Sequence, residues 1–331
     1  MIVDVHCHAV PRSLIEAIMR DPARFEASVA YDGGTPSLVI DGRERGAFAP
    51  ARFDPEVRLA DMDEAGIEIQ VLSPTPSFLL NRRDDGVAAH LAAVMNEGLA
   101  EMAAESPRFW AIGQLPLQST ELSLIELDHI CDLGLLGVEV GANVEDVDLD
   151  DEVLEPIWAR LNELQLTVFV HPTNPKPLPR MEAYHLTNLI GNPLDTSIAL
   201  SRLMLSGVLL RYPDIRFYFA HGGGFVPYQY GRIDHAYRVN EDTSSAIDVL
   251  PSSLLSRVWF DTITHAAPSL RYLIDAVGDA NVVVGTDYPS DMGDTRIAGT
   301  LGELGLSTEA RDRIEHENAE RLFAQPVGAI R

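Results

Sequence analysis

The sequence predicts an α/β protein, a (β/α)8 TIM barrel with a small insertion after its first strand. Three observations predict this fold. Eight short β-branched runs alternate with amphipathic stretches, the 331 residues suit one barrel domain, and polar side chains end several of the runs. A doubly wound open sheet is the alternative, but no G-x-G-x-x-G follows the first run. We therefore expect residues 1–331 to form one barrel domain.

The expected strands are spread along the chain, with amphipathic stretches such as PEVRLADMDEAG and LDDEVLEPIWARLNELQ between them. Strands that alternate with helices form βαβ units, and these make a parallel sheet. We expect strands at 2–6, 67–72, 109–115, 136–140, 166–171, 215–221, 257–262 and 281–287.

Two segments interrupt this alternation. Residues 11–54 are rich in Gly and Pro around a short SLVI run, and we expect an insertion there that forms a small β-hairpin lid. Residues 172–191 form a second long loop, after the fifth strand. Loops at the carboxyl ends of barrel strands lie over the active face and carry function.

Composition excludes several classes of protein. The chain is 46% hydrophobic and 23% charged, as a globular protein with a large core would be. Its formal net charge of −25 argues against nucleic acid and anionic membrane surfaces as partners, since both need clustered Lys and Arg. The two cysteines, Cys7 and Cys131, provide neither a disulfide framework nor a four-cysteine zinc site.

Targeting signals are not apparent in the sequence. The first residues lack a basic region followed by an apolar signal core. No apolar run reaches the roughly 18 residues that a transmembrane helix requires. We therefore expect a cytoplasmic protein without a membrane partner.

Histidine and aspartate side chains lie at the ends of four expected strands. His6 and His8 share one face of the first strand, and two imidazoles at this spacing can bind one ion. His171, His221 and Asp287 end three other runs. The carboxyl ends of all strands in a parallel barrel meet at one rim, so these groups should converge. His and carboxylate ligands favour a divalent transition metal such as zinc, with a coordination position left for water or substrate.

The other polar residues of interest receive less direct roles. We expect Asp4, which alternation places on the face of His6, to have a structural partner rather than to bind the metal, because an unpaired buried carboxylate is costly. His185 and His265 are candidates in loops. Four histidines fall in helical patterns and receive structural roles: His90, His129, His235 and His316.

At these residues the sequence resembles the amidohydrolase superfamily, in its branch of metal-dependent decarboxylases typified by 2-amino-3-carboxymuconate-6-semialdehyde decarboxylase. The resemblance covers nearly the whole chain. It rests on VDVHCH (3–8), DPEVRLADMDEAGI (54–67), VHP (170–172), AHGGG (220–224), GRIDHAY (231–237) and GTDYP (285–289).

The resemblance implies roles for the residues in these motifs. His6, His8, His171 and Asp287 would bind one divalent metal ion, zinc as the first choice and manganese as the alternative. His221 would be the general acid/base, with Asp287 also in a catalytic role. The family fold is a (β/α)8 barrel with an insertion after its first strand.

The resemblance also implies an assembly. Members of the branch are typically homodimers, in which an Arg of the GR-I/V-D motif reaches the neighbouring site. That residue is Arg232 here.

The sequence departs from the family at several positions. The fourth strand, GVEV, lacks the Lys that bridges two metals in many hydrolytic members, so we expect one ion; Glu139 on this strand is the candidate bridge to a second. Thr173 and Ser290 replace a Trp and a Phe near the substrate. Gly46 stands where the substrate-binding Arg of the insertion would fall.

Three arginines are candidates for binding a substrate carboxylate: Arg45, Arg43 and Arg232. A guanidinium can bind a carboxylate through two parallel hydrogen bonds, whereas surface salt bridges are the alternative role for all three. Gly222–Gly224 is either an anion site built of backbone N–H groups or a tight strand–helix turn.

Three functional classes follow, in order of preference. The first is a metal-dependent non-oxidative decarboxylase of an unsaturated or aromatic carboxylic acid, a small-molecule carboxylate. The second is a metal-dependent hydrolase of an amide, lactone or C–C bond, or a related hydratase. The third is a non-catalytic metal-binding protein.

Overall fold

The computed structural model describes residues 1–32, 34–79, 84–173 and 180–324, and its parallel strands pair into two sheets. The smaller sheet has the order β1 (Val3–Ala9), β5 (Ile69–Pro74), β6 (Phe109–Ala111). The larger one has the order β14 (Val282–Val283), β13 (Trp259–Asp261), β12 (Arg216–Phe219), β11 (Thr167–His171), β8 (Gly137–Gly141), β7 (Gly113–Gln114). Every pairing in both sheets is parallel.

The expected strands are therefore confirmed in place, although their ends differ. The run 109–115 is divided at Ile112 into β6 and β7, which belong to different sheets. The strands β12 and β14 end before His221 and Asp287, so both residues lie in the loops that follow.

Further hydrogen bonds join the two sheets at both of their edges. The Val5 N–H donates to the Val284 carbonyl at 2.8 Å, which links β1 to the residue after β14. The Ile112 N–H donates to the Leu72 carbonyl at 3.0 Å, which links β5 to the segment between β6 and β7. The mixed α/β fold is confirmed, and the closed barrel stays a prediction because the strand ladders form two sheets.

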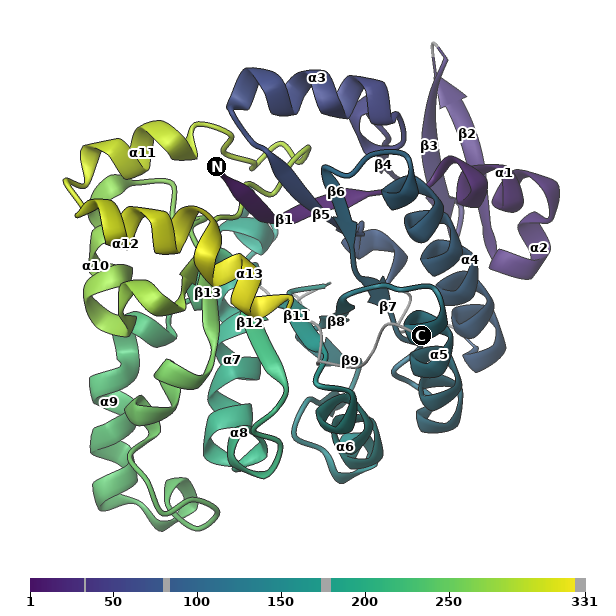
Figure 1. The fold of residues 1–331 in the computed structure, drawn as a ribbon. Coiled ribbons are helices and arrows are strands. Elements are labelled where there is room, and N and C mark those ends of the chain that lie inside the picture. The colour runs from purple at the N-terminus through teal and green to yellow at the C-terminus, as the bar shows by residue number, and fades with distance from the viewer. Residues whose placement is uncertain (33, 80–83, 174–179, 325–331) are drawn as a thin grey trace.

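Helices lie around the strands (Figure 1). They are α1 (Arg12–Arg20), α2 (Pro22–Phe25), α3 (Pro55–Ala65), α4 (Asp85–Ala104), α5 (Thr120–Asp132), α6 (Glu155–Leu164), α7 (Asn192–Leu205), α8 (Val208–Arg211), α9 (Val226–Val239), α10 (Ala267–Val277), α11 (Ile297–Glu303), α12 (Thr308–Asp312) and α13 (Asn318–Leu322). Short helical turns include η1 (Pro50–Arg52), η4 (Thr187–Gly191) and η5 (His221–Gly223).

Side chains from both sheets share one apolar cluster. Val5 of β1 and Val71 of β5 belong to it, as do Phe169 of β11 and Tyr218 of β12. Phe169 and Tyr218 stack with ring centroids 4.2 Å apart, and Leu322 of α13 packs in the same cluster. The space between the sheets is therefore filled with side chains and closed by α13.

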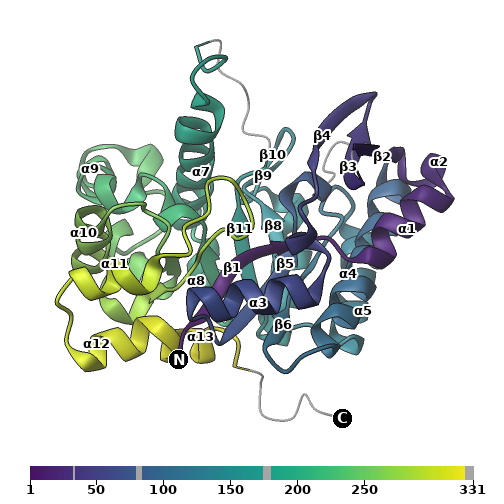
Figure 2. The same cartoon turned by 90° about the horizontal axis from the view of Figure 1, so that it is seen from above.

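A separate antiparallel sheet follows α1 and α2. It consists of β2 (Ala27–Asp32), β3 (Thr35–Ile40) and β4 (Arg43–Ala47), in that order. Figure 2 shows it beside α1, at the margin of the molecule. The SLVI run lies in β3, at the centre of three strands rather than in a two-stranded hairpin. A smaller hairpin, β9 (Asn143–Val144) and β10 (Val147–Asp148), follows β8.

Strand β1 contains a bulge that changes one prediction. Its register with β5 shifts between Asp4 and Cys7. Val5 lies in the cluster between the sheets, and the adjacent His6 ring lies 4.8 Å from Phe169 of the same cluster. Strict alternation fails at the bulge, so the expectation that Asp4 shares a face with His6 is wrong.

Local sequence signals define α3, which holds β1 in place. Asp54 caps its N-terminus by accepting from the Glu56 and Val57 N–H groups, Pro55 occupies its first position, and Gly66 ends it in the left-handed conformation. The buried Arg58 of α3 donates to the His8 carbonyl at 2.6 Å and to Gln70 Oε1 at 2.8 Å. Arg58 thus ties α3 to β1 beside His8.

Arg58→Met should lower the free energy of unfolding by about 2–4 kcal/mol, because it leaves a buried carbonyl and a buried amide without their charged donor. Urea denaturation measures this loss. Arg160→Met is the matched control, since Arg160 makes exposed ion pairs with Asp128 and Glu163 and should change stability by less than about 1 kcal/mol. Equal losses in the two variants would contradict the assigned role of Arg58.

Candidate metal centre

The five predicted side chains meet at the carboxyl ends of four strands. His6 and His8 lie on β1, and His171 is the last residue of β11. His221 opens the turn after β12, and Asp287 lies in the loop after β14. All but His221 are buried, and His221 is partly exposed. Residues distant in sequence are therefore brought together as the strand pattern predicts.

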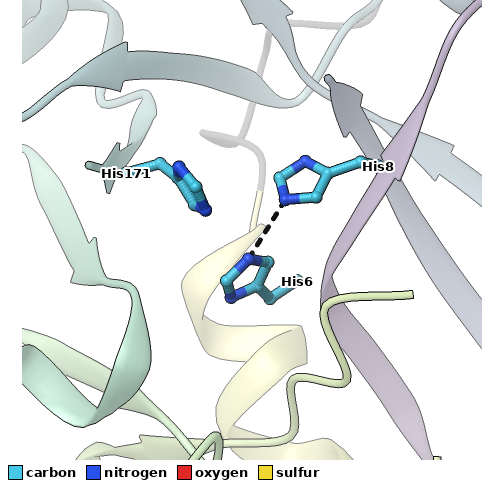
Figure 3. A group of neighbouring side chains, drawn as sticks. All are labelled: His6, His8 and His171. Carbon is cyan, nitrogen blue, oxygen red and sulfur yellow. Dashed lines mark hydrogen bonds between the residues drawn. The ribbon is translucent and has the colours of Figure 1, made fainter. Parts of the chain in front are cut away.

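The distances place potential ligand atoms within reach of one ion. His6 Nε2 lies 3.2 Å from His8 Nε2, and Asp287 Oδ1 lies 3.3 Å from His8 Nε2 and 3.8 Å from His6 Nε2. The His171 ring centroid is 5.1 Å from that of His6 and 5.0 Å from that of His8. Figure 3 shows the three rings converging from β1 and β11.

Ligand atoms fall into two overlapping groups, each with every member within 4.8 Å of the others. One group is His6, His8 and His171, and the other is His6, His221 and Asp287. Glu139 belongs to neither group in the described part of the chain.

The protons of the three buried histidines are fixed by what their Nδ1 atoms contact. Nδ1 of His8 lies 3.0 Å from the Pro74 carbonyl, and Nδ1 of His171 lies 2.9 Å from the Pro172 carbonyl. Nδ1 of His6 lies 2.6 Å from Asp261 Oδ2. Carbonyl and carboxylate oxygens only accept, so each Nδ1 carries a proton, and each Nε2 has a lone pair whenever its ring is neutral.

Three neutral rings in this arrangement would turn their Nε2 lone pairs towards one another, which a cation between them would stabilise. The Nε2 of His171 is buried and has no hydrogen-bond partner among the described residues, and the close Nε2 atoms of His6 and His8 have no proton to share when both rings are neutral. Imidazole Nε2 atoms with their Nδ1–H groups bound to oxygen are the usual form of metal-ligating histidines. The donor set thus fits a divalent transition metal.

Charge supports this assignment. Burial lowers the pKa of His8 to about 4, and burial with the neighbouring histidines holds the pKa of His171 well below its usual value. Burial opposes ionisation of Asp287, but contacts with His221 and His8 and the charge of His6 hold its pKa well below the usual range. Neutral His8 and His171 beside ionised Asp287 are in the protonation states that metal binding requires. Burial opposes protonation of His6, but its contact with Asp261 raises its pKa overall, so a metal at its Nε2 would compete with a proton.

Asp261, the last residue of β13, organises this centre and was not among the sequence candidates. Its Oδ2 accepts from His6 Nδ1 at 2.6 Å and from the His221 N–H at 2.9 Å. Its Oδ1 accepts from the N–H groups of Gly222 at 2.8 Å and Ile263 at 3.0 Å. This buried carboxylate therefore fixes both a potential metal ligand and the turn that carries His221. Its only sequence signal was an Asp at the end of an expected strand.

The turn after β12 gives His221 its position. His221 has φ +55°, and Gly222, Gly223 and Gly224 also have positive φ. A Cβ on Gly224 would lie 2.2 Å from the Pro193 carbonyl oxygen, so only glycine fits there. Strained backbone at a non-glycine residue often marks a functional position.

The glycine turn is not an anion site. The Gly222 N–H donates to Asp261, the Gly223 N–H to the Ala220 carbonyl and the Gly224 N–H to the His221 carbonyl. Two of these donors bind carbonyls of the turn and the third binds Asp261 of β13, so none is free for an anion and the interpretation as a tight strand–helix connection is confirmed.

Asp4 has the structural role predicted for it. Its Oδ1 accepts from the His6 and Thr286 N–H groups, and its Oδ2 accepts from Thr286 Oγ1 at 2.6 Å and Gln70 Nε2 at 3.0 Å. These bonds tie β1 to the loop that carries Asp287.

Glu139 on β8 is a buried carboxyl group beside the centre. Its Oε2 lies 3.9 Å from His8 Nδ1, and neither oxygen has a well-formed hydrogen bond to the described residues. Burial raises its pKa to about 8. Outside the two ligand groups, Glu139 is a neutral carboxylic acid at physiological pH rather than an obvious bridge to a second ion.

Two connected cavities open from the centre. The larger, of about 570 Å³, is lined by apolar and aromatic side chains from η4, the start of α9 and α10, namely Leu189, Tyr228, Tyr272 and Leu273, and by Phe225 just before α9. The smaller, of about 370 Å³, is lined by polar groups that include Arg52, Thr75, Ser77, Thr173, His185, Ser290 and Asp291. His221 and Asp287 line both cavities.

Two of the predicted substrate arginines, Arg43 and Arg232, are not among the described residues that line these cavities. Arg43 is exposed on β4, Arg232 is exposed on α9, and the Arg45 side chain lies outside the described residues. Arg52 lines the smaller cavity instead, and sequence reasoning missed it because no family motif includes it. Thr173 and Ser290 do line that cavity.

The remaining histidines lie in loops or in helices as the pattern predicted. His185 and His265 lie at the smaller and larger cavity respectively. The four histidines assigned structural roles lie on α4, α5, α9 and η9 (Arg313–Glu317). None of the helices in the described ranges combines the length and apolar character needed to cross a bilayer.

A parallel α/β fold that gathers His and Asp side chains able to bind a metal at its strand ends is typical of metal-dependent α/β enzymes. The amidohydrolase family model matches residues 3–325, nearly the whole chain. The protein belongs to the amidohydrolase family, in its branch of metal-dependent decarboxylases. The resemblance in the sequence motifs is thereby confirmed.

Named relatives cover most of the chain. The 2-amino-3-carboxymuconate-6-semialdehyde decarboxylase of Dictyostelium discoideum is 32% identical over 298 residues, 88% of this chain and 82% of the relative. The gamma-resorcylate decarboxylase of Polaromonas sp. is 29% identical, over 82% of this chain and 86% of the relative. A 2-keto-4-carboxy-3-hexenedioate hydratase of Sphingobium sp. is 25% identical, over 98% and 96%.

Solved structures share the fold. The apo IDCase of Metarhizium anisopliae superposes with a TM-score of 0.82 at 25% identity, over 98% of this chain and 97% of that one. A dihydroxybenzoic acid decarboxylase from Polaromonas sp. with bound manganese and 2-nitroresorcinol has a TM-score of 0.77 at 23% identity, over 97% and 96%.

Asp261→Asn should weaken metal binding about 10–100-fold. Both carboxylate oxygens of Asp261 accept hydrogen bonds from N–H groups, whereas an asparagine would place its NH2 group, itself a donor, against some of these donors. Competition with a chromogenic chelator measures the affinity for Mn²⁺ and Zn²⁺. The control is Glu126→Gln, since Glu126 is a buried carboxylate bound to Asn96 and His129 away from the centre. Unchanged affinity in folded Asp261→Asn protein would refute this role.

Glu139 should make the stability of the metal-free protein fall as pH rises. In the unfolded chain a Glu side chain has its ordinary pKa of 4.5, whereas burial in the folded protein raises the pKa of Glu139 to about 8. The folded state therefore binds more protons between these values, and ionisation at higher pH costs stability.

Between pH 5 and 8 the free energy of unfolding of the wild type should fall, and in Glu139→Gln this fall should be smaller by about 1–3 kcal/mol. Urea denaturation in chelator measures it. The exposed Glu303→Gln at the end of α11 is the control and should retain the wild-type slope. An unchanged slope in Glu139→Gln would contradict the raised pKa.

Proposed function

We propose that this protein is a metal-dependent non-oxidative decarboxylase of an unsaturated or aromatic carboxylic acid. The single observation that carries the proposal is the convergence of the Nε2 atoms of three histidines and Asp287 beside a cavity that His221 also lines. The relatives named as decarboxylases support the reaction class.

The ligands of the metal are His6, His8, His171 and Asp287. One ion is proposed, because Glu139 lies outside the two ligand groups formed by described residues. Zinc and manganese both suit imidazole and carboxylate ligands. The manganese in the dihydroxybenzoic acid decarboxylase structure supports manganese, so the preference for zinc that the sequence suggested is replaced by manganese as first choice.

The metal, when bound, supplies Lewis acidity that polarises a substrate oxygen. The residues of the chain do the rest. His221 Nε2 lies 3.9 Å from Asp287 Oδ2 and lines both cavities, so it faces the space where substrate binds. Asp261 holds the His221 backbone, which keeps the imidazole aimed at that space.

In the proposed reaction, His221 delivers a proton to the substrate carbon that bears the carboxylate. The C–C bond to the carboxylate then breaks, CO2 leaves, and the bonding electron pair returns to the substrate to restore its unsaturation. The product carries hydrogen where the carboxylate was, with no oxidant and no solvent oxygen consumed. General acid catalysis of this kind contributes roughly 10²–10⁴-fold.

The finer features of the fold belong to the same proposal. The two parallel sheets form one closed (β/α)8 barrel, which the hydrogen bonds between their edges and their shared apolar cluster support. Residues 11–54 form an insertion whose antiparallel sheet lies beside the barrel. The protein is a cytoplasmic homodimer, with exposed Arg232 of α9 available to a neighbouring site.

A hydratase or hydrolase is the second candidate, favoured by the hydratase relative from Sphingobium sp.. Both reactions add the elements of water to the substrate. Decarboxylation and hydration therefore differ in whether oxygen from the solvent enters the product.

A screen of unsaturated and aromatic carboxylic acids in H2(18)O tests the proposal. The manganese-loaded protein should release CO2 and form a product without 18O. His221→Asn should lower kcat about 10²–10⁴-fold with unchanged metal content. His129→Asn on α5, which pairs with Glu126 away from the centre, is the control. Incorporation of 18O without CO2 release would shift the assignment to the second candidate.

A further inference from the structure

Thr173 carries a buried hydroxyl group that is not used within the described structure. The residue lies two positions after His171 and lines the smaller cavity. It is 5% exposed, and its hydroxyl oxygen is buried with no hydrogen-bond partner among the described residues. An unpaired polar group in the interior is destabilising, and most buried polar atoms of folded proteins have a partner. A hydroxyl retained at this cost beside a cavity is suited to pair with a ligand.

We propose that the Thr173 hydroxyl forms a hydrogen bond with a polar substituent of the substrate, and that it selects acids carrying a hydroxyl or carbonyl oxygen at that place. This inference rests on the proposed function, because it assigns a substrate contact within the same site. It adds a feature of the acid beyond its carboxylate and its unsaturation. Thr173 is thus a specificity-determining residue, and His221 keeps the proton transfer.

The other threonines that line the smaller cavity use their hydroxyl groups within the protein. Thr75 Oγ1 donates to the Ala9 carbonyl at 3.2 Å. Thr187 Oγ1 donates to the Met181 carbonyl at 3.3 Å. Of the three threonines in this lining, Thr173 is therefore the one whose hydroxyl has no bond to the described part of the chain.

The backbone at Thr173 is held by the end of β11. His171 Nδ1 donates to the Pro172 carbonyl at 2.9 Å, and this carbonyl belongs to the peptide bond that leads into Thr173. The His171 carbonyl accepts from the Ala142 N–H at 2.9 Å, which joins the end of β11 to the residue after β8. The separation between Thr173 and the metal centre is therefore fixed before a substrate binds, as a specific contact requires.

The chemistry of a hydroxyl defines what it can recognise. It donates one hydrogen bond and accepts others, so it suits either a hydroxyl or a carbonyl oxygen of the ligand. An acid with hydrogen or a methyl group at this place would leave the Thr173 hydroxyl unpaired, and sites with such groups reject analogues that lack the partner. The resemblance places an aromatic side chain at this position, so the hydroxyl contact is particular to this chain.

The two cavities give the bound acid a direction. The polar substituent lies in the smaller cavity with Thr173, and the rest of the molecule extends past His221, which lines both cavities, towards Phe225 and Leu273 in the larger one. The substrate is therefore an acid with one polar side and one apolar side.

Calorimetric titration of the manganese-loaded protein with salicylate, and with the dihydroxybenzoates that add one hydroxyl to it, tests the assignment. At least one dihydroxybenzoate should bind the wild type about 5–10-fold more tightly than salicylate does. Thr173→Val should abolish this advantage and change salicylate affinity less than about twofold, because valine lacks only the hydroxyl. Thr173→Ser should retain the advantage, since serine keeps that group.

Thr196→Val on α7 is the matched control. Thr196 is buried, its hydroxyl donates to the Asn192 carbonyl at 3.1 Å, and it is not among the described residues that line the cavities. This variant should keep the wild-type preference. In ligand-free protein, Thr173→Val should unfold at the same or a higher urea concentration than the wild type, because the hydroxyl it removes is unpaired. A hydroxyl with a structural role would give a lower midpoint.

Four results would overturn the proposal: no dihydroxybenzoate preferred by the wild type, a preference that survives in metal-loaded Thr173→Val, a preference lost equally in Thr173→Ser, or a lower urea midpoint in Thr173→Val. Metal analysis of each variant establishes that the centre is loaded. The binding readout needs no turnover. Loss of the preference in Thr173→Val of a protein that releases no CO2 supports the hydroxyl contact and refutes the decarboxylase, whereas CO2 release with the preference unchanged in Thr173→Val does the reverse.

Discussion

The structure depends on three imidazoles whose Nδ1–H groups are held by oxygen atoms, so that their Nε2 lone pairs face one another. With neutral rings this arrangement is repulsive unless a cation lies between them, and the rest of the fold maintains it. Strand β1 carries two of the rings, α3 holds β1 through Arg58, and Asp261 holds His6. The contacts that stabilise the fold therefore also hold the three rings where a cation would bind.

Asp261 and Asp4 show how the scaffold is linked to the chemistry. Asp261 connects β13 to His6 and to the turn of His221, and Asp4 connects β1 to the loop of Asp287. Each buried carboxylate accepts several hydrogen bonds, which compensates for its removal from water. One continuous network therefore positions the proposed ligands and the proposed acid/base group.

Much of this could be predicted from the sequence, because strand–helix alternation carries strand ends to one side. His6, His8, His171, His221 and Asp287 were found in this way. The bulge in β1 could not be predicted, because it depends on how β1 pairs with β5. Arg52 was missed because it lies outside every motif, and its place in the cavity depends on Thr75 and Ser290, distant in sequence.

The most direct test of the central claim is anomalous diffraction at the metal absorption edge from crystals of the manganese-loaded protein. The account predicts one strong peak per chain, bonded to Nε2 of His6, His8 and His171 and to a carboxylate oxygen of Asp287. A peak elsewhere, or none at this position while the four side chains still converge, would contradict it.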